Sequence, residues 1–286
     1  MHKNQAFSRP EPTLLRATTF AWGERTYIMG IVNVTPDSFS GDGLTGTQEA
    51  VAHAVEQANL GSDIVDVGGE STRPGHVAID DAAEIQRLIP VIEGLRARAP
   101  GTVISADTYK PAVFRAAHAA GADVLNSVWG MSDELMEVAL ECDVPFVAMH
   151  NKVTPQYDGD VVDEVLRFLS EIGERATRAG ISPSRVVLDP GIGFGKTAEH
   201  NLAVLRSLDR FPHLGFPTMI GTSRKSTIGR LTGREPHERT YGTAATVALA
   251  IEAGIDIVRV HDVAQMKDAV SVSDAIVRGW RPDSWT

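Results

Sequence analysis

Residues 186–197 read Val186-Val187-Leu188-Asp189-Pro190-Gly191-Ile192-Gly193-Phe194-Gly195-Lys196-Thr197. A short apolar run, rich in β-branched residues, stops at an acid, a proline and three alternating glycines, and this pattern predicts a buried strand that ends in a tight loop. Glycine has no Cβ and reaches positive φ freely, so glycines at this spacing let the backbone come close to a ligand. We therefore expect Asp189 to stand at the mouth of a binding pocket.

Two known phosphate-binding motifs each fail at this loop by one position. A Walker loop requires a glycine five residues before Gly195, where the chain has Pro190. The dinucleotide fingerprint counted from Gly191 and Gly193 requires a third glycine where the chain has Lys196. We therefore expect no P-loop here, and a glycine-rich strand-to-helix turn without a ligand is the alternative interpretation of this loop taken alone.

The same design, an apolar run that ends in a polar residue, recurs along the chain. Such runs predict strands at residues 28–32, 63–67, 103–105, 124–125, 145–149, 186–188, 217–220 and 257–260. Helices are predicted at residues 48–59, 83–97, 111–120, 133–141, 162–176, 201–210, 243–253 and 265–277. Eight alternations without a linker predict an α/β fold, a parallel (β/α)8 TIM barrel that forms a single domain over residues 15–286. An open doubly wound sheet is the second choice, and the missing dinucleotide fingerprint disfavours it.

The residues before the barrel divide into two parts. Residues 1–14, which include two prolines, are expected to be flexible. Residues 18–22, the turn residues Gly23 and Glu24, and residues 26–28 alternate in character and predict a β-hairpin. Such a hairpin would plug the bottom of the barrel.

Composition excludes several classes of function. The formal net charge of −10 argues against a nucleic-acid partner, because a binder of that kind needs a basic face. Cys142 is the only cysteine, which excludes an internal disulfide and a thiolate metal cluster. The sequence has neither a signal-peptide core nor an apolar run of the ~18 residues that span a membrane, so we expect a cytoplasmic protein with no membrane partner.

Every predicted strand ends in polar residues. In order these are Asn33; Asp66, Gly68, Gly69 and Glu70; Asp107; Asn126; His150 and Asn151; Asp189; Ser223, Arg224, Lys225 and Ser226; and Arg259, His261 and Asp262. A single aspartate at a strand end is more often a helix N-cap than a functional residue. Because the active site of a (β/α)8 barrel forms at the C-terminal ends of its strands, the complete set predicts one shared pocket.

The charges of these residues predict a pocket with two ends. Asp107, Asn126 and Asp189 are rich in acceptors and suit a planar nitrogen heterocycle that presents N–H donors. Arg224, Lys225, Arg259 and His261 are interpreted as cationic and suit phosphate or carboxylate. A heterocycle with a phosphate leaving group fits both ends, and the acids would stabilise a cation formed when that group departs. The loops at residues 33–40 and 69–75 are either lids or solvated surface loops.

Five separated motifs resemble dihydropteroate synthase and match it from about residue 15 to residue 279. They are Ile28-Met29-Gly30-Ile31-Val32-Asn33-Val34-Thr35-Pro36-Asp37-Ser38-Phe39-Ser40, then Asp66-Val67-Gly68-Gly69-Glu70-Ser71-Thr72-Arg73-Pro74-Gly75, the loop at residues 189–196, Thr222-Ser223-Arg224-Lys225-Ser226, and Arg259-Val260-His261-Asp262. The resemblance implies condensation of 6-hydroxymethyl-7,8-dihydropterin diphosphate with para-aminobenzoate, which gives 7,8-dihydropteroate and pyrophosphate. It also implies Mg²⁺ as cofactor, a homodimer, and sulfonamides as analogues of aminobenzoate.

The resemblance assigns roles to individual positions. The pterin ring would be held by Asp107, Asn126, Asp189 and Lys225, and the diphosphate by Asn33, Arg259 and His261. Asn33 would also bind Mg²⁺, and Asp107, Asp189, Lys225 and Asn33 would be the catalytic residues. The aminobenzoate site would comprise Thr72, Arg73, Pro74, Phe39, Phe194 and Ser226. Ionisation of the pterin diphosphate would precede attack by the aryl amine.

The chain departs from the family pattern at three places. Gly41-Asp42-Gly43 replaces the usual Asp-Gly-Gly, Ser127 replaces the aspartate that often follows Asn126, and Ala106 replaces valine before the pterin-binding acid. The first change suggests a variant with altered sensitivity to sulfonamides. Two other hypotheses stay open, a pterin-binding paralogue without turnover and a methyltransferase domain for methyltetrahydrofolate, although the cationic residues at 223–226 disfavour the latter.

Overall fold

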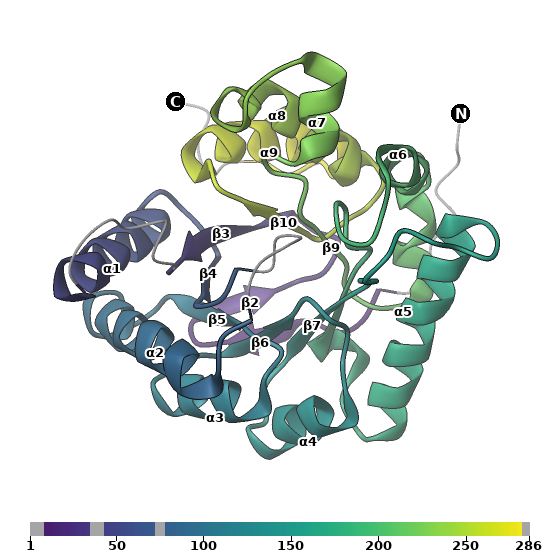
Figure 1. Cartoon of the computed structure of the whole chain (residues 1–286). Coiled ribbons are helices and arrows are strands. Elements are labelled where there is room, and N and C mark those ends of the chain that lie inside the picture. Colours follow the sequence, from purple (N-terminus) through teal and green to yellow (C-terminus); the bar gives the residue numbers. More distant parts are fainter. Residues whose placement is uncertain (1–8, 35–42, 72–77, 282–286) are drawn as a thin grey trace.

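Eight parallel strands form a barrel in which helices surround a central sheet (Figure 1). The computed structural model describes residues 9–34, 43–71 and 78–281. The strands are β3 (Tyr27–Asn33), β4 (Ile64–Gly68), β5 (Val103–Asp107), β6 (Val124–Ser127), β7 (Phe146–Met149), β8 (Val186–Asp189), β9 (Met219–Ile220) and β10 (Ile257–Val260). They pair in the order β8-β7-β6-β5-β4-β3-β10-β9, and a bridge between Leu188 and Thr218 joins the two ends of the sheet. The predicted (β/α)8 barrel is confirmed.

The helices pack on the outside of the strands. They are α1 (Gly43–Asn59), α2 (Asp81–Arg98), α3 (Pro111–Ala119), α4 (Asp133–Glu141), α5 (Val161–Arg178), α6 (Ala198–Arg206), α7 (Ser226–Thr232), α8 (Thr240–Glu252) and α9 (Val263–Val277). In α5, the predicted three- and four-residue spacing buries Val165, Leu169 and Ile172. The carboxylate of Asp160 accepts from the backbone N–H groups of Val162 and Asp163 and so caps the first turn.

The connection between β9 and β10 differs from the prediction. Two helices, α7 and α8, lie there instead of the one predicted at residues 243–253. The predicted helix at 201–210 ends at Arg206 and continues as a 3₁₀ turn, Leu208–Arg210. Strand β9 is shorter than predicted because Pro217 has no N–H, and the N–H of Thr218 donates to the Asp256 carboxylate at 2.9 Å rather than to a strand.

The N-terminal hairpin exists, but its predicted strands were wrong. The antiparallel strands are β1 (Thr13–Leu15) and β2 (Thr18–Phe20), joined by a turn in which Arg16 has φ of 55°. Tyr27 belongs instead to the barrel, where it pairs in parallel with Ile257. The alternation of residues 18–28 therefore arose from two separate sheets, and a period of two cannot say which strand pairs with which.

The segment after the hairpin plugs the bottom of the barrel, as predicted. The rings of Phe20, Trp22 and Tyr27 lie 4.7–5.7 Å apart, centroid to centroid. They pack against the apolar side chains that fill the N-terminal half of the barrel interior, which are Met29, Ile64, Val103, Val124, Val147, Val187, Met219 and Ile257. A second, larger apolar cluster lies between strands and helices. The polar residues at the strand ends lie at the opposite, C-terminal end of the barrel.

Part of the expected flexible N-terminus is described. Thr13 and Leu14 belong to β1, and the guanidinium of Arg9 donates to Asp256 at 2.6 Å. The domain limits given above remain predictions.

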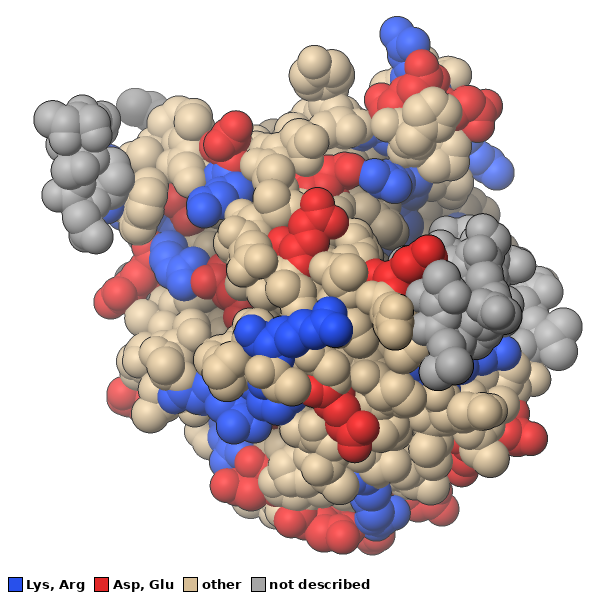
Figure 2. Space-filling model, turned by 90° about the vertical axis from the view of Figure 1, so that its left-hand side faces the viewer, with Lys and Arg blue, Asp and Glu red and all other residues tan. Residues whose placement is uncertain are grey.

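Charges of both signs alternate on the surface. On the face drawn in Figure 2, which is the left-hand side of Figure 1, Lys and Arg side chains are interspersed with Asp and Glu. Within the described ranges, no helix has the length and apolar character needed to cross a bilayer.

Candidate active site

The strand register brings the predicted polar residues into one row. Asn33 pairs with Gly68, Gly68 with Asp107, and Asp107 with Asn126 along four successive strands. Asn33, Asp107 and Asp189 are each the last residue of their strands, one or more residues beyond the predicted strand ends. The register therefore places Asn33, Asp107 and Asn126 at the same end of the barrel.

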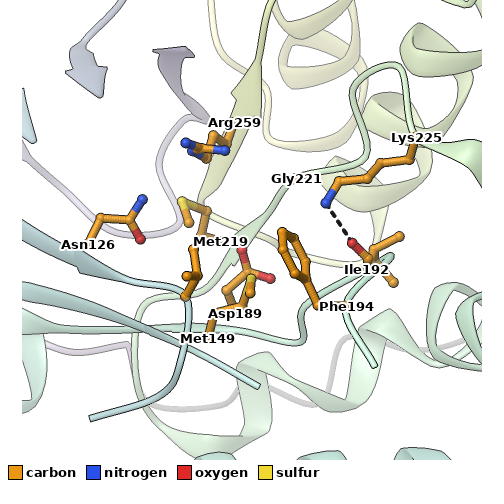
Figure 3. Close-up of a pocket in the computed structure, with 10 residues that line it drawn as sticks. Asn126, Met149, Asp189, Ile192, Phe194, Met219, Gly221, Lys225 and Arg259 are labelled. Carbon is orange, nitrogen blue, oxygen red and sulfur yellow. Dashed lines mark hydrogen bonds between the residues drawn. The ribbon is translucent and has the colours of Figure 1, made fainter. Parts of the chain in front are cut away.

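A pocket opens among these strand ends. It is lined by Asn126, Val128, Met149, Asp189, Ile192, Phe194, Met219, Gly221, Lys225 and Arg259. Figure 3 shows Asn126 and Lys225 on opposite sides, with Asp189 and Phe194 between them and Arg259 above. Two methionines complete the lining, and the sequence analysis missed them because apolar strand residues carry no signal that separates pocket from core.

The glycines of residues 186–197 serve a different purpose from the one predicted. Gly191 has φ of 70°, and a Cβ on it would overlap the carbonyl oxygen of His150. Gly195 has φ of 56°, and its Cβ would overlap backbone atoms of Lys152. These two glycines therefore let the loop pack against the segment after β7 rather than against a ligand. Gly193 differs, because a Cβ on it would lie 3.0 Å from Cδ of Lys225, which lines the pocket.

Asp189 is buried and Lys225 is half-buried, and these two ionisable groups lie on facing elements. Oδ1 of Asp189 accepts from the N–H of Gly191 at 2.7 Å, and burial raises the pKa of its carboxyl group. Nζ of Lys225 donates to the carbonyl oxygen of Ile192 at 2.8 Å and lies 3.9 Å from the ring centroid of Phe194 (Figure 3). Burial lowers the pKa of Lys225 to about 7, against the opposing attraction of Asp189. The lysine is therefore partly neutral near pH 7 until an anion approaches.

Lys196 ties the glycine-rich loop to the segment after β7, a role that the sequence analysis missed. Its Nζ lies 2.8 Å from Nδ1 of His150 and donates to the carbonyl oxygens of Gly191 at 3.0 Å and Phe194 at 3.2 Å. Burial lowers the pKa of Lys196 to about 7, and burial together with the lysine lowers that of His150 to about 3. His150 is therefore neutral and accepts through Nδ1.

Arg259 lies among the acids rather than at a separate cationic end. Its Nε donates to Oδ2 of Asp66 at 2.7 Å, and Nη2 lies 2.6 Å from the same oxygen and donates to Oδ2 of Asp107 at 2.8 Å. The predicted separation of acids from cations is wrong for this residue, because a spacing along the chain cannot show which strand-end charges pair across a barrel.

His261 is neutral at pH 7, which corrects its interpretation as a cation. Burial, with the nearby charges of Arg259 and Arg224, lowers its pKa to about 3. Its Nδ1 lies 3.0 Å from Oγ of Ser223, which also accepts from the His261 N–H at 3.1 Å. Arg224 pairs with Asp262, Nε donating to Oδ2 at 3.1 Å. His261 can thus offer a hydrogen bond to an anion but not a charge.

The residues assigned to aminobenzoate are described only in part. Phe194 lines the pocket, and Ser226 is exposed at the first position of α7. Phe39, Thr72, Arg73 and Pro74 lie outside the described residues. The preceding Glu70 is fixed, since its carboxylate accepts from Nζ of Lys110 at 2.5 Å and from the hydroxyl of Tyr109 at 2.9 Å.

Asn33 fits a magnesium ion as one ligand among several. In residues 9–34, 43–71 and 78–281, no three His, Cys, Asp or Glu side chains form a group that could hold a metal by themselves. Mg²⁺ prefers oxygen ligands and is often held by one or two protein groups together with substrate phosphates. The half-buried amide of Asn33 at the end of β3 suits that arrangement.

The comparisons agree on one family of proteins. Residues 29–261 match the family described as pterin binding enzyme. Dihydropteroate synthase of Bacillus subtilis is 43% identical over 265 residues, which cover 92% of each chain. Dihydropteroate synthase of Clostridium difficile, solved in the presence of pteroic acid, superimposes with a TM-score of 0.87 at 44% identity and covers 91% of this chain and 99% of that one. The Xanthomonas albilineans enzyme in complex with 7,8-dihydropteroate gives a TM-score of 0.82 at 44% identity, with 91% and 96% covered.

Proposed function

This chain belongs to the dihydropteroate synthase family of pterin-binding enzymes, and we propose that it joins 6-hydroxymethyl-7,8-dihydropterin diphosphate to para-aminobenzoate. The products are 7,8-dihydropteroate and pyrophosphate. The observation that carries the proposal is the pocket itself, in which the buried acceptors of Asp189 and Asn126 face Lys225 at the C-terminal end of a (β/α)8 barrel. The solved relative with bound 7,8-dihydropteroate supports the same reaction.

The pterin ring binds through its donors and one acceptor. An aminopyrimidine edge presents several N–H groups, and the carboxylate of Asp189 and the amide oxygen of Asn126 can accept them. Lys225 supplies donors for a ring oxygen or nitrogen from the other side of the pocket (Figure 3). An N–H group that donates to a buried carboxylate replaces the hydrogen bonds to water that the carboxylate lost on burial. Asp189 therefore favours this edge over an apolar ring.

The reaction begins with ionisation. The C–O bond between the pterin methylene and the diphosphate breaks, and the electron pair leaves with pyrophosphate. The aminobenzoate nitrogen then uses its lone pair to form the new C–N bond and releases its proton to water. Asp107 and Asp189 stabilise the intermediate cation, so catalysis rests on charge stabilisation and positioning.

The diphosphate would be held by Asn33, Arg259 and His261, and Asn33 would also hold Mg²⁺. The ion offsets the negative charge of the leaving group when bound. His261 supplies a hydrogen bond rather than a charge, because its low pKa keeps it neutral. Arg259 reaches the diphosphate only by giving up one of its carboxylate partners.

Two other functions are less favoured. A methyltransferase domain would have no use for Ser223, Arg224 and Lys225 beside a pterin. A paralogue that binds pterin without turnover is suggested by Ser127, whose buried Oγ has no hydrogen-bond partner in the described structure. That paralogue would bind the pterin but release no pyrophosphate.

The test of the proposal is pyrophosphate release from the pterin diphosphate in the presence of Mg²⁺ and aminobenzoate. Release that requires aminobenzoate is expected. Binding of the pterin without release of pyrophosphate would favour the paralogue. Omission of Mg²⁺ is expected to abolish turnover. The same assay with a sulfonamide tests whether this chain is a sulfonamide-insensitive variant. In such a variant, turnover persists in the presence of the drug, although the drug mimics aminobenzoate.

Variants test the division of the pocket. Lys225→Ala and Asp189→Asn should remove pterin binding, whereas Arg73→Ala should chiefly raise the KM for aminobenzoate. Calorimetric titration with a pterin and steady-state kinetics measure the two effects separately. Equal loss of both ligands in all three variants would contradict the assigned roles.

The expected homodimer would use the face formed by α7, α8 and α9, which lie together at the top of Figure 1. This face exposes Leu231, Leu249, Val272 and Ile276, and the last is 79% exposed. An apolar surface of this kind is unusual on a monomer and typical of an interface. The cytoplasmic location also remains a prediction.

A further inference from the structure

Asp66 is a buried acid that the roles above leave unused. It lies in the middle of β4 with 0% of its surface exposed and pairs in register with Ile31 and Ser105. The pocket lining includes its partners Asn126 and Arg259 but not Asp66 itself. It therefore lies outside the pocket lining and contacts two of the lining residues.

One oxygen of Asp66 collects donors from two pocket residues. Oδ2 accepts from Nδ2 of Asn126 at 3.1 Å and from Nε of Arg259 at 2.7 Å, with Nη2 of Arg259 at 2.6 Å. A carboxylate can only accept, so the Asn126 amide must turn its nitrogen toward Asp66. Its oxygen is then left for a donor in the pocket, and Figure 3 shows that oxygen on the side of Asp189.

Asp66 also competes for the charge of Arg259. The guanidinium carries one positive charge, and the carboxyl groups of Asp66 and Asp107 both bind it. In each carboxyl group, Oδ1 is buried and has no hydrogen-bond partner in the described part of the chain. One cation cannot fully compensate two buried carboxylates, because each retains a desolvation cost.

The shared charge of Arg259 affects the pKa of the Asp107 carboxyl group. Burial raises the pKa of this carboxyl group to about 7, Arg259 opposes the rise, and Asp66 adds to it. Glu84 of α2 raises the pKa further, and Lys225 lowers it. These four groups face Asp107 from β10, β4, α2 and the segment before α7.

We propose that Asp66 is a positioning residue of the pterin pocket, which turns the Asn126 amide oxygen toward the ligand and divides the charge of Arg259 with Asp107. The second part governs whether Asp107 is ionised when a cation forms beside it. This inference rests on the proposed function for its ligand, but its electrostatic part can be measured without turnover.

Two substitutions separate the two parts. Asp66→Asn can place its amide oxygen where Oδ2 lies and its amide nitrogen where the unpartnered Oδ1 lies, so it keeps the hydrogen bonds and removes the charge. Asp66→Ala removes both. Ser105→Ala is the matched control, because Ser105 is the register partner of Asp66, is fully buried, and has an Oγ without a partner.

The electrostatic part is tested by infrared titration of the Asp107 carboxyl group, identified by its loss in Asp107→Asn. In Asp66→Asn, Asp107 faces Arg259 without a competing acid, so its midpoint should fall by about one pH unit or more. The midpoint should stay in place in Ser105→Ala. An unchanged titration midpoint of Asp107 in Asp66→Asn would overturn the electrostatic part. A lowered midpoint in a protein that shows no synthase activity would support the electrostatic part and contradict the proposed function.

The orientation part is tested by calorimetric titration with 6-hydroxymethylpterin at pH 8. Asp66→Asn should bind the pterin within about threefold of the unsubstituted protein. Asp66→Ala should bind it at least about tenfold more weakly, because this variant loses the hydrogen bonds that orient Asn126 and Arg259. Equal affinity in Asp66→Ala would refute the orientation role. If the alanine variant does not fold, Asp66→Asn still decides the question. A tenfold loss of pterin affinity in Asp66→Asn would contradict the orientation role, because this variant keeps the hydrogen bond to Asn126.

Discussion

Asp107 and Lys225 carry opposite formal charges, yet burial moves the pKa of each to about 7. The strand ends therefore hold an acid that resists ionisation, Asp107, and the pocket beside it is lined by a base that resists protonation, Lys225. Groups with perturbed pKa values of this kind gather at functional sites. A ligand that supplies the missing hydrogen-bond or charge partner offsets the desolvation cost of the buried group. At the scale of single residues, the pocket is prepared for a ligand with both donors and negative charge.

The raised pKa of Asp107 makes stability depend on pH. Its folded-state pKa lies above the unfolded value of about 3.9, so the folded state holds the proton more tightly. The stabilisation is complete below about pH 4 and is lost as the pH rises through about 7. Asp107→Asn removes this titration, so the thermal midpoint of the unsubstituted protein should fall relative to the variant between pH 4 and pH 7. A constant difference across this range would contradict the assignment.

Substitution of Gly191 by alanine tests whether the glycine-rich loop tolerates a Cβ at this position. Alanine at this position would place Cβ on the carbonyl oxygen of His150 at φ of 70°, whereas alanine at Gly233, with φ of 71°, meets nothing within 4 Å. The matched backbone angles cost both variants ~1–2 kcal/mol. Only Gly191→Ala adds an overlap, worth at least another ~1–3 kcal/mol. Denaturant unfolding should separate the two variants, and equal losses would show that the loop relaxes freely.

At the scale of elements, the pocket is held together by contacts between loops. The glycine-rich loop after β8 packs its backbone on the segment after β7, and Asn201 of α6 binds it from the other side, Oδ1 accepting from the Gly193 N–H at 2.8 Å. Nδ2 of Asn201 donates to Thr227 of α7 at 3.1 Å. The position of Lys225, just before α7, is therefore linked to the loop that carries Phe194.

Lys196 is the side-chain link between these loops. Lys196→Met should weaken pterin binding about tenfold, because Ile192 and Phe194, which contact Lys225, lie on the loop that it holds. The control is Lys152→Met, since Nζ of Lys152 bonds Gln156 and Glu164 within the neighbouring segment and not the glycine-rich loop. Calorimetric titration with a pterin compares the two, and similar affinities would argue that the backbone contacts suffice.

At the scale of the whole molecule, polarity is divided along the barrel axis. Aromatic residues close the N-terminal end and apolar side chains fill the interior above them. Charged groups occupy the opposite end, where the carboxyl groups of Asp66 and Asp107 share the guanidinium of Arg259. A closed apolar base holds the strand backbones in place, so ligand binding requires movement of side chains only, such as the exchange of a carboxylate partner by Arg259.

The apolar face of α7, α8 and α9 predicts self-association. Leu249→Glu places a charge on this face, where Leu249 is 61% exposed, and should convert a dimer to monomers in analytical ultracentrifugation. Leu140→Glu is the matched control, because Leu140 is 43% exposed but lies on α4, on the opposite side of Figure 1. A monomer before substitution, or a dimer that survives Leu249→Glu, would contradict this interface.

The barrel and the location of its polar residues could be predicted from the amino-acid sequence alone. Apolar runs of strand length alternate with helical spacing such as that of Val165, Leu169 and Ile172, and both patterns depend on neighbours within a few residues. The acids and amides that end the runs, such as Asp107 and Asp189, follow from the same local reading, because parallel strands place their C-terminal ends together.

The pairing of individual groups depends on how distant segments pack, and it could not be predicted from the sequence. Arg259 binds Asp66 and Asp107 across the barrel, His261 loses its charge by burial, Gly191 meets His150, and Tyr27 pairs with Ile257 rather than with the hairpin. Each outcome depends on distances between segments far apart in the chain and on the water excluded from them. Charge pairing, pKa and close backbone contact are set by that packing, and a period of two or 3.6 residues carries no information about it.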